Sequence, residues 1–247
     1  MHHPIRSLWI VLTIAILLPL PALGQRGAAD SHRERRVHRT RLDRPQGFEI
    51  GLRSGYGIPV GGAFGSRIAG GPVTVVTELN GLIQGQVPIW IDLGYRLRSG
   101  LYLGAYAEIG PGIQSQCSPP NCYLFNLRAG FNVRYHFLAG RRVEPWVGLG
   151  IGYELLFTRV KHPDDYTGSF VTMGALHGFE FLNAQVGIDF RVTRHAVLAP
   201  FFTCAVSQYE RLDNRLDGGP VFSTSDFAKP IHAWLLFGLR GAYNFGS

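Results

Sequence analysis

The sequence predicts an all-β fold, an eight-stranded antiparallel up-and-down transmembrane β-barrel. Apolar and polar residues alternate with a period of two in segment after segment, which is typical of strands with one apolar face. After an N-terminal export signal there is no run of about 18 apolar residues, which excludes a helical membrane protein. The composition, 46% hydrophobic and 17% charged, argues against disorder for most of the chain.

Residues 1–24 have the pattern of a secretory signal peptide. Arg6 precedes an apolar run over residues 8–18, and the small residues Ala22 and Gly24 suit cleavage before Gln25. An N-terminal membrane anchor is the alternative, but the run is short of the roughly 20 apolar residues that span a bilayer. We therefore expect export, and the strands described next indicate the cell outer membrane of a Gram-negative bacterium as the destination.

Residues 25–46 form a basic segment that we predict to be a disordered periplasmic leader. Seven arginines stand there against three acidic residues, so the segment contributes +4 to the formal net charge of +7. The arginines are Arg26, Arg33, Arg35, Arg36, Arg39, Arg41 and Arg44. A basic run in a cytosolic protein favours nucleic acid, but export removes that partner, so we expect no nucleic-acid binding. Contact with anionic lipid or with cell wall is left open.

Four predicted strands lie in the first half of the chain, and in each of them apolar residues alternate with charged residues or glycine. They are residues 48–56, 87–97, 101–109 and 123–137. The segment 123–137 is the clearest, with Phe125 and Phe131 on one face and Arg128 and Arg134 on the other. Soluble strands average about five or six residues, whereas a tilted membrane strand needs about 9–11. The length and regularity of this segment therefore favour a membrane strand.

Four further strands are predicted in the second half of the chain. They are residues 147–155, 182–190, 197–209 and 233–245. The facing of the segment 197–209 is ambiguous, because either of two alternating sets could point outward. These sets are Phe201, Thr203 and Ala205, or Phe202, Cys204 and Val206. The total of eight is an even number, as bacterial membrane barrels require.

The predicted connections alternate between short and long. The short ones are residues 98–100, 138–144 and 193–196, and the long ones are residues 58–82, 111–122, 158–178 and 210–230. Transmembrane barrels place short turns on the periplasmic side and longer loops outside. Eight strands then bring both ends of the barrel domain, residues 47–247, to the periplasmic side.

The two faces of the predicted strands differ in chemistry. Aromatic residues gather near the strand ends of the outward face, like the girdles of a membrane barrel: Tyr95, Tyr135, Phe137, Tyr153, Phe157, Tyr243 and Phe245. The inward face carries a predicted lumen charge network: Glu49, Arg53, Asp92, Arg96, Glu108, Arg128, Arg134, Glu154, Asp189, Arg191 and Arg240. An eight-stranded interior is just wide enough for its own side chains, and buried charges must pair. We therefore expect an interior plugged by salt bridges and water, and no open pore.

The chain resembles the small outer-membrane β-barrel families of OmpA/OmpX type. The resemblance covers residues 47–245 and rests on the strand number, the alternating connections, the export signal and the ending Leu239–Phe245. That ending is similar to the C-terminal assembly signal of these families, which implies the barrel assembly machinery as a partner through the last strand. It departs from that signal in two ways, since Gly246 and Ser247 follow the phenylalanine and Arg240 stands where glycine is usual.

The three cysteines predict one small disulfide. Cys117 and Cys122 bracket a short segment with two prolines, and an oxidising periplasm would let them pair. No third or fourth ligand stands nearby in the sequence, so we expect no metal there. Cys204 lies in an apolar segment and is interpreted as a small hydrophobic residue.

Candidate catalytic residues are few. His162 and His177 fall in one predicted outer loop with Asp164, Asp165 and Ser169, without the spacing of a known motif. His136 lies on an inward face with no serine nearby, and His195 lies in a tight turn. We therefore predict a protein that is not an enzyme and that uses no cofactor.

The sequence leaves several function classes open. A structural or surface-interaction barrel, monomeric and acting through four long extracellular loops on an external ligand, is the favoured interpretation. A narrow channel or a transport barrel for small hydrophobic molecules is the main alternative, and a lipid-modifying barrel enzyme is a third. A secreted lipocalin-like barrel would require the apolar face to point inward. The partner common to the membrane interpretations is outer-membrane lipid.

Overall fold

The computed structural model describes residues 46–67, 73–114, 121–164, 168–216 and 219–246. The predicted signal peptide and the leader up to residue 45 lie outside these residues. The elements are β1 (Gly47–Arg67), β2 (Val73–Glu78), α1 (Leu79–Leu82), β3 (Ile83–Gln86), β4 (Ile89–Arg96), β5 (Leu101–Gln114), β6 (Cys122–His136), β7 (Val143–Asp164), β8 (Gly168–Arg191), β9 (Ala196–Leu216), β10 (Val221–Thr224) and β11 (Ile231–Asn244). Within the described ranges, no helix is long and apolar enough to cross a membrane.

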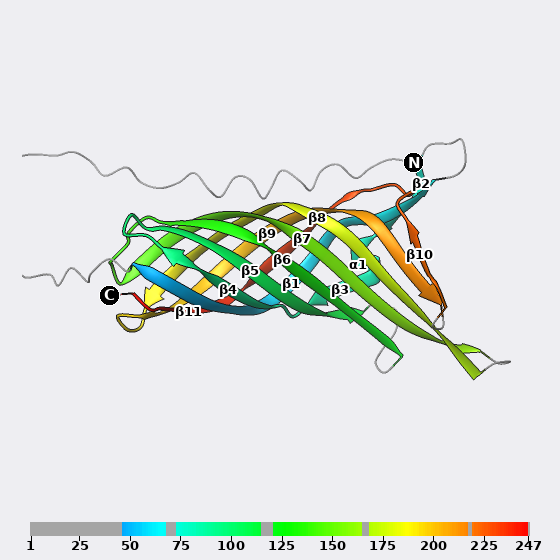
Figure 1. The fold of residues 1–247 in the computed structure, drawn as a ribbon, viewed down its shortest axis with the longest axis horizontal. Helices are drawn as coiled ribbons and strands as arrows, with labels where there is room; N and C mark the ends of the chain where they lie inside the picture. Colours follow the sequence, from blue (N-terminus) through cyan, green and yellow to red (C-terminus); the bar gives the residue numbers. More distant parts are fainter. Residues whose placement is uncertain (1–45, 68–72, 115–120, 165–167, 217–218, 247) are drawn as a thin grey trace, which may run out of the picture. The chain divides into compact units, whose positions relative to one another are not determined.

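The strands close into an antiparallel barrel with eight positions, as predicted (Figure 1). Around the ring, β1 pairs with β3 and β4, which together fill the second position and pair with β5. The strands from β5 to β9 then pair in order, β9 pairs with β11, and β11 pairs with β1 to complete the ring. In addition, β2 pairs with β1 and β10 pairs with β9. The register joins Glu49 to Asn244 at one end of this seam and Gly61 to His232 at the other. Short turns and the last residues of β11 share one end of the barrel, which we call the turn end. The opposite end is called the extended end.

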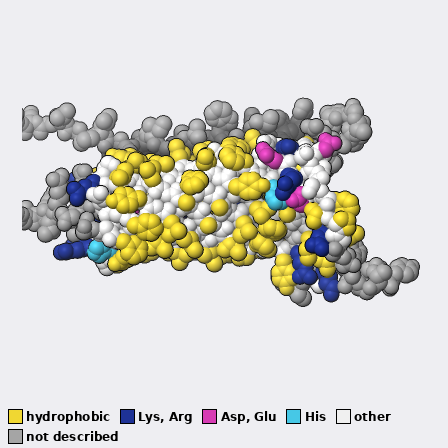
Figure 2. Space-filling view, viewed as in Figure 1, with side chains coloured by type: hydrophobic (Ala, Val, Ile, Leu, Met, Phe, Trp, Pro, Cys, Tyr) yellow, Lys and Arg dark blue, Asp and Glu magenta, His cyan; other side chains and the backbone are white. Residues whose placement is uncertain are grey.

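Side chains alternate between the outside and the inside of the barrel, with an interruption at a bulge in β8. The outward residues of β6 include Phe131, which is 71% exposed, whereas the neighbouring inward Asn132 is only 2% exposed. A belt of apolar side chains covers the visible outer surface between the two ends (Figure 2). This distribution is that of a transmembrane barrel, because every backbone group is paired in the closed ring and the apolar surface faces lipid. It rules out the lipocalin-like alternative.

The structure resolves the facing of β9. Phe202, Cys204 and Val206 point outward, and Phe201, Thr203 and Ala205 are buried inside.

The predicted long loops are largely wrong as loops, because most of those of their residues that the structure describes belong to strands. The strands β7, β8 and β9 are 22, 24 and 21 residues long, and β7 and β8 run together to Asp164 and Gly168. Charged residues appear on the outward face where the strands leave the apolar belt, and the sequence interpretation took this loss of alternation as the strand end. Backbone pairing does not depend on side-chain polarity, so the ladder continues beyond the belt.

Inward glycines make room for large aromatic rings. The Tyr106 ring lies over Gly130 and Gly152, and the Tyr102 ring lies over Gly94 and Gly104. A Cβ atom at Gly130 would stand 2.9 Å from the Tyr106 ring, closer than such atoms normally approach. The crowding of an eight-stranded interior therefore explains part of the high glycine content.

An apolar cluster closes the interior at the extended end. Leu79 of the short helix α1 and Ile83 of β3 are fully buried against inward residues of the barrel wall. The wall residues of this apolar cap include Leu124, Leu156, Leu176, Tyr209, Trp234 and Leu236, with Phe227 from the segment before β11. The sequence interpretation expected charges and water throughout the interior, but here apolar packing replaces them.

Candidate functional site

The turn-end half of the interior holds a cluster of buried ion pairs, which we call the turn-end cluster. It combines five arginines with four carboxylates: Arg53, Arg96, Arg134, Arg191 and Arg240, with Glu49, Asp92, Glu144 and Asp189. These residues come from β1, β4, β6, β7, β8 and β11. Side chains from opposite walls therefore meet across the whole width of the barrel.

Arg96 is the centre of the turn-end cluster. Its Nε lies 2.8 Å from Glu49, its Nη1 lies 3.0 Å from Glu144, and its Nη2 lies 3.1 Å from Asp189. Three nitrogens of one guanidinium thus contact three carboxylates from three different strands. The planar fork of arginine suits such multiple contacts, which a lysine ammonium could not reproduce.

The other arginines of this cluster add further cross-links. Arg240 of β11 pairs with Glu49 of β1 and, at 3.2 Å, with Asp189 of β8. The Nε of Arg53 donates to Asp92 at 2.6 Å, and the Arg53 guanidinium stands 4.3 Å from the Trp90 ring centroid. These pairs leave each carboxylate of the cluster with at least one arginine contact.

Arg134 is the exception among the arginines. Its nearest carboxylate oxygen, on Glu49, is 3.6 Å away, and its guanidinium nitrogens have no hydrogen-bond partner among the described residues. The guanidinium instead lies over the Tyr102 ring, 3.8 Å from its centroid, and 5.5 Å from that of Trp146. Arg134 is thus the surplus cation of the cluster, held by aromatic faces.

A second group of charges lies midway along the barrel, with the balance reversed. Arg128 donates to Glu108 at 2.6 Å and to Glu180 at 3.3 Å. Tyr106 and Asn183 also donate to Glu180. One buried arginine therefore serves two buried carboxylates, and hydrogen bonds from neutral groups supplement it.

Glu154 forms a separate hydrogen-bonding centre without an arginine. Its carboxylate accepts bonds from Trp234 Nε1 at 2.7 Å, Tyr209 Oη at 2.9 Å and Asn126 Nδ2 at 2.9 Å, and His232 Nε2 lies 3.1 Å away. The prediction placed Glu154 among salt bridges to arginine. The structure gives it neutral donors and a histidine, directly below the apolar cap.

Sequence reasoning missed two of the interior acids, Glu144 and Glu180. Glu144 was assigned to a turn, but β7 already begins at Val143 and turns Glu144 inward. Glu180 precedes a bulge at which both Phe181 and Leu182 point outward. Because the bulge adds one residue, the residues of β8 before it face the opposite way from what a count from the end of the strand predicts. Trp146, whose ring N–H donates to Asp189 at 2.8 Å, was also overlooked. A continuous period-two count from Val143 would have found Glu144 and Trp146, whereas no sequence signal marks the bulge.

His136 and two carboxylates of the turn-end cluster have the arrangement of possible metal ligands. One ligand atom from each of His136, Glu144 and Asp189 lies within 4.8 Å of the others. Arg96, however, already contacts the same Glu144 and Asp189 oxygens that face His136. A positive group therefore occupies the position that a cation would need, and these residues belong to the ion-pair network.

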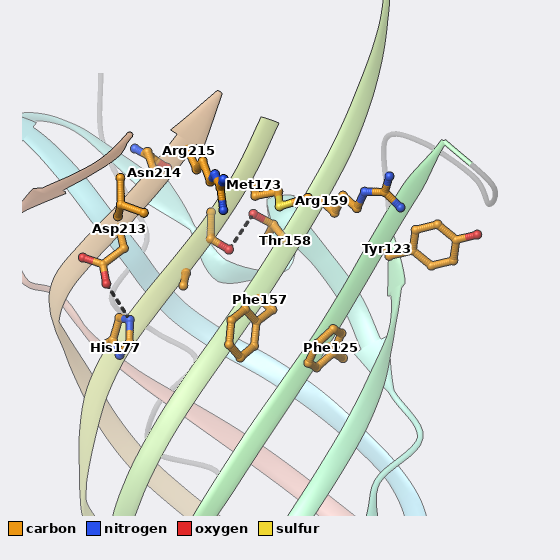
Figure 3. A pocket seen from close by; sticks show the side chains of 13 residues that line it. Tyr123, Phe125, Phe157, Thr158, Arg159, Met173, His177, Asp213, Asn214 and Arg215 are labelled. Atoms are coloured by element: carbon orange, nitrogen blue, oxygen red, sulfur yellow. Dashed lines mark hydrogen bonds and ion pairs between the residues drawn. The ribbon is translucent and has the colours of Figure 1, made fainter. Parts of the chain in front are cut away.

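A pocket opens on the outer surface beside the extended end, and we call it the rim pocket (Figure 3). It has a volume of about 490 Å³ and is formed by β6, β7, β8, β9 and β10. Strand pairing places its side chains in two transverse rows. One row runs Phe125, Phe157, Ala175, Asp213 and Ser223, and the next runs Tyr123, Arg159, Met173, Arg215 and Val221.

His177 and Asp213 line the rim pocket and belong to a connected set of side chains that continues outside it. His177 Nε2 lies 3.0 Å from Asp213, Arg211 lies 3.1 Å from the same carboxylate, and Tyr153 Oη lies 3.2 Å from His177 Nδ1. A hydrogen bond from Ser223 lowers the pKa of the Asp213 carboxyl below its ordinary value, and the charges of Arg211 and His177 lower it further. Asp213 is therefore held as a paired carboxylate.

The structure separates His177 from the companions that the sequence suggested. The side chains of His162, Asp164 and Ser169 and the whole of Asp165 lie outside the described residues. The contacts of His177 come instead from β7 and β9. His195 lies in the turn before β9 and stacks with Tyr243 at the turn end.

Cys117 also lies outside the described residues, so the disulfide between Cys117 and Cys122 stays a prediction. Cys204 is a free cysteine on the outward face of β9.

Searches of family models and of curated proteins give no match to this chain. Among solved structures, it is similar to a major outer membrane protein from Thermus thermophilus, with 13% identity and a TM-score of 0.51, over 81% of this chain and 99% of the other. The outer membrane protein OprG from Pseudomonas aeruginosa (11% identity, TM-score 0.49, 83% and 99%) and neisserial surface protein A (16%, 0.43, 80% and 97%) also match. The match to the Thermus thermophilus protein agrees with the closed antiparallel ring described above, and the chain has the fold of a bacterial outer-membrane β-barrel.

Proposed function

We propose that the protein is an outer-membrane barrel with an interior closed to solutes. Its function is then interaction with an external ligand through the surface that it presents outside the cell. The observation that carries this proposal is the filled interior. Four layers of buried side chains follow one another along the barrel axis: the turn-end cluster, the ion pairs of Arg128, the hydrogen bonds around Glu154, and the apolar cap. This stack of buried side chains disfavours the channel and transport alternatives.

The orientation follows from the unequal ends of the barrel. Short turns and the end of β11 lie at the turn end, which is the periplasmic side in membrane barrels. The extensions of β7, β8 and β9, with the added strand β10, then stand outside the cell. We propose that these extensions, and no catalytic centre or cofactor, form the interaction surface of the protein.

Conductance measurements test the closed interior. The full chain, refolded and inserted into planar lipid bilayers, should give no stable single-channel steps. A variant with Leu79→Gly and Ile83→Gly, which loosens only the apolar cap, should also fail to conduct, because the charged and hydrogen-bonded side chains below the cap still fill the interior. Reproducible steps from the wild type would refute the closed interior.

Labelling of intact cells tests the orientation. In a Cys204→Ala background, a cysteine placed by Val221→Cys in β10 should react with a membrane-impermeant thiol reagent. The matched variant Ser99→Cys, in the turn between β4 and β5, should react only after the outer membrane is permeabilised. The reverse pattern would show that the barrel is inserted the other way round.

A further inference from the structure

The exposed charged residues of the turn end all have the same sign. They are Arg98 between β4 and β5, Arg141 and Arg142 between β6 and β7, and Arg194 between β8 and β9. None of these four side chains has a hydrogen bond or an ion pair among the described residues. The turns that carry them contain no acidic residue. This end of the barrel therefore presents four positive charges that no described residue neutralises.

The acids inside the barrel do not offset these charges. Glu49, Glu144 and Asp189 are buried, and each of them already contacts Arg96. The turn-end cluster to which they belong has five arginines for four carboxylates, so its own sum is also positive. The field of the interior therefore adds to that of the four exposed arginines.

The extended end has a different surface charge. Figure 2 shows side chains of both signs there, whereas Lys and Arg side chains mark the turn end. The exposed charged residues of the extended end include Glu78, Glu210, Asp226, Lys161 and Lys229. A surface of mixed sign favours no anion over long distances, so the uniform positive charge is a property of the turn end.

Backbone hydrogen bonds hold neighbouring turns together. The His136 N–H donates to the Gly100 carbonyl at 2.9 Å, and the Arg191 N–H donates to the Arg142 carbonyl at 2.9 Å. Gly100 and Gly140 both have a φ of 91°, a conformation that a tight turn needs and that glycine adopts without strain. The turns are thus fixed side by side, and their arginines follow one another around this end of the barrel.

The apolar belt extends to these arginines. Exposed apolar residues stand within three positions of them in the sequence: Leu97, Leu138, Val143 and Val192. Tyr135 and Phe137, in edge-to-face contact at 5.3 Å, are aromatic residues of the kind that forms the girdle of a membrane barrel. An arginine at such a boundary lays its apolar stem along the belt and directs its guanidinium toward the headgroups. The four guanidinium groups therefore lie at the height of lipid phosphates.

We propose that the turn end binds anionic phospholipids through their headgroups, in the leaflet that surrounds it. The planar fork of arginine suits phosphate oxygens, and each arginine near an anionic membrane surface strengthens binding about fivefold. Apolar side chains beside each arginine accept the acyl chains of the same lipid. This surface lies at the opposite end from the proposed interaction surface, so the inference goes beyond that function and can be tested separately from it.

Native mass spectrometry of the full chain in a non-ionic detergent, with defined lipids added, tests the proposal. Phosphatidylglycerol is the anionic probe, and phosphatidylcholine with the same acyl chains is the zwitterionic reference. The wild type should bind phosphatidylglycerol at least about tenfold more tightly, because several arginines act on one headgroup charge. A parallel titration in detergent by fluorescence, at rising ionic strength, should show this preference weaken, since salt screens exposed charges.

Two triple variants assign the preference to the turn end. The turn-end variant combines Arg98→Gln, Arg141→Gln and Arg194→Gln. The matched control removes three exposed cations of the extended end, by Arg159→Gln, Lys161→Gln and Lys229→Gln. Both variants lose the same charge and keep the basic residues 25–46 unchanged. Phosphatidylglycerol binding should weaken at least about tenfold in the turn-end variant and change little in the control. Heat-modifiable gel mobility confirms that both are folded.

Three results would overturn the proposal. The first is an undiminished preference for phosphatidylglycerol in the turn-end variant. The second is an equal loss in both variants, because net charge alone would then set the preference. The third comes from sedimentation with purified peptidoglycan. If the turn-end variant lost binding to peptidoglycan but kept its binding to phosphatidylglycerol, the partner of the turn end would be the cell wall.

Discussion

Replacing Arg128 by methionine should be among the most damaging single changes in this barrel. The side chain is fully buried and contacts Glu108 at 2.6 Å and Glu180 at 3.3 Å, with no second arginine described beside either acid. Arg128→Met keeps the apolar stem and removes the charge, which leaves two buried carboxylates without a cation. Breaking a buried ion pair by removing one partner costs about 3–5 kcal/mol, and we expect a loss near the upper value because two acids are stranded.

Arg134→Met is the matched comparison, since it makes the same chemical change on the same strand. Arg134 belongs to a cluster in which arginines outnumber carboxylates, and its closest acid is 3.6 Å away. Its removal strands no carboxylate and forfeits chiefly the contact with the Tyr102 ring, worth about 0.5–2 kcal/mol. The free energy of unfolding should therefore fall by at least about 2 kcal/mol more in Arg128→Met than in Arg134→Met.

Urea unfolding of the barrel in lipid vesicles, extrapolated to zero denaturant, measures both losses. Adding Glu180→Gln to Arg128→Met should recover part of the stability, because it neutralises one stranded acid and keeps an acceptor for Tyr106. Equal losses in the two arginine variants, or no recovery in the double variant, would refute the assignment of Arg128 as the cation that serves two acids and of Arg134 as a surplus cation.

Other consequences can be checked independently. Phe131→Arg should cost about 2–4 kcal/mol in the same vesicle assay, since it places a charge on the lipid face near mid-belt, and Asn132→Gln should cost less; a neutral Phe131→Arg would contradict the assigned faces. Cys117 and Cys122 should resist thiol labelling in unreduced, exported protein, and their joint replacement should leave stability nearly unchanged. The pKa of the Asp213 carboxyl lies below its ordinary value, so the pairing of this carboxylate stabilises the rim above the ordinary pKa, and the stabilisation is lost as the pH falls through the lowered pKa. A dye attached at the rim should report this loss as a change in fluorescence on acidification. The variant Asp213→Asn should not show that change. Cell fractionation should recover the protein with outer membranes, and a soluble periplasmic pool would contradict the membrane assignment.

The closed ring and the facing of most strands could be predicted because one physical pattern determines both. A lipid-facing strand must alternate, so Phe131 outside and Asn132 inside followed directly from their parity. The pairing partners inside the barrel could not be predicted in this way. Arg134 and Arg128 have the same parity on the same strand, yet one is surplus and the other serves two acids, and this depends on which residues the opposite wall presents.

The rim was beyond sequence reasoning for a different reason. Outside the bilayer both faces of a strand meet water, so alternation no longer reports that the ladder continues. The stretch containing Ala175 and His177 was therefore interpreted as loop, although it is strand β8. The bulge beside Glu180 is a local backbone feature with no composition signal, and it hid one of the two carboxylates that Arg128 holds.

The arrangement of the turn-end cluster has a consequence for the order of assembly. Glu49 lies on the first strand of the ring and its partner Arg240 on the last, and Arg96 joins acids from three strands. No single hairpin contains a complete set of partners, so a half-inserted sheet would carry unmatched charges into hydrocarbon. The energetic penalty for such an intermediate favours concerted insertion, in which β1 and β11 pair at the same time as the charged side chains leave water.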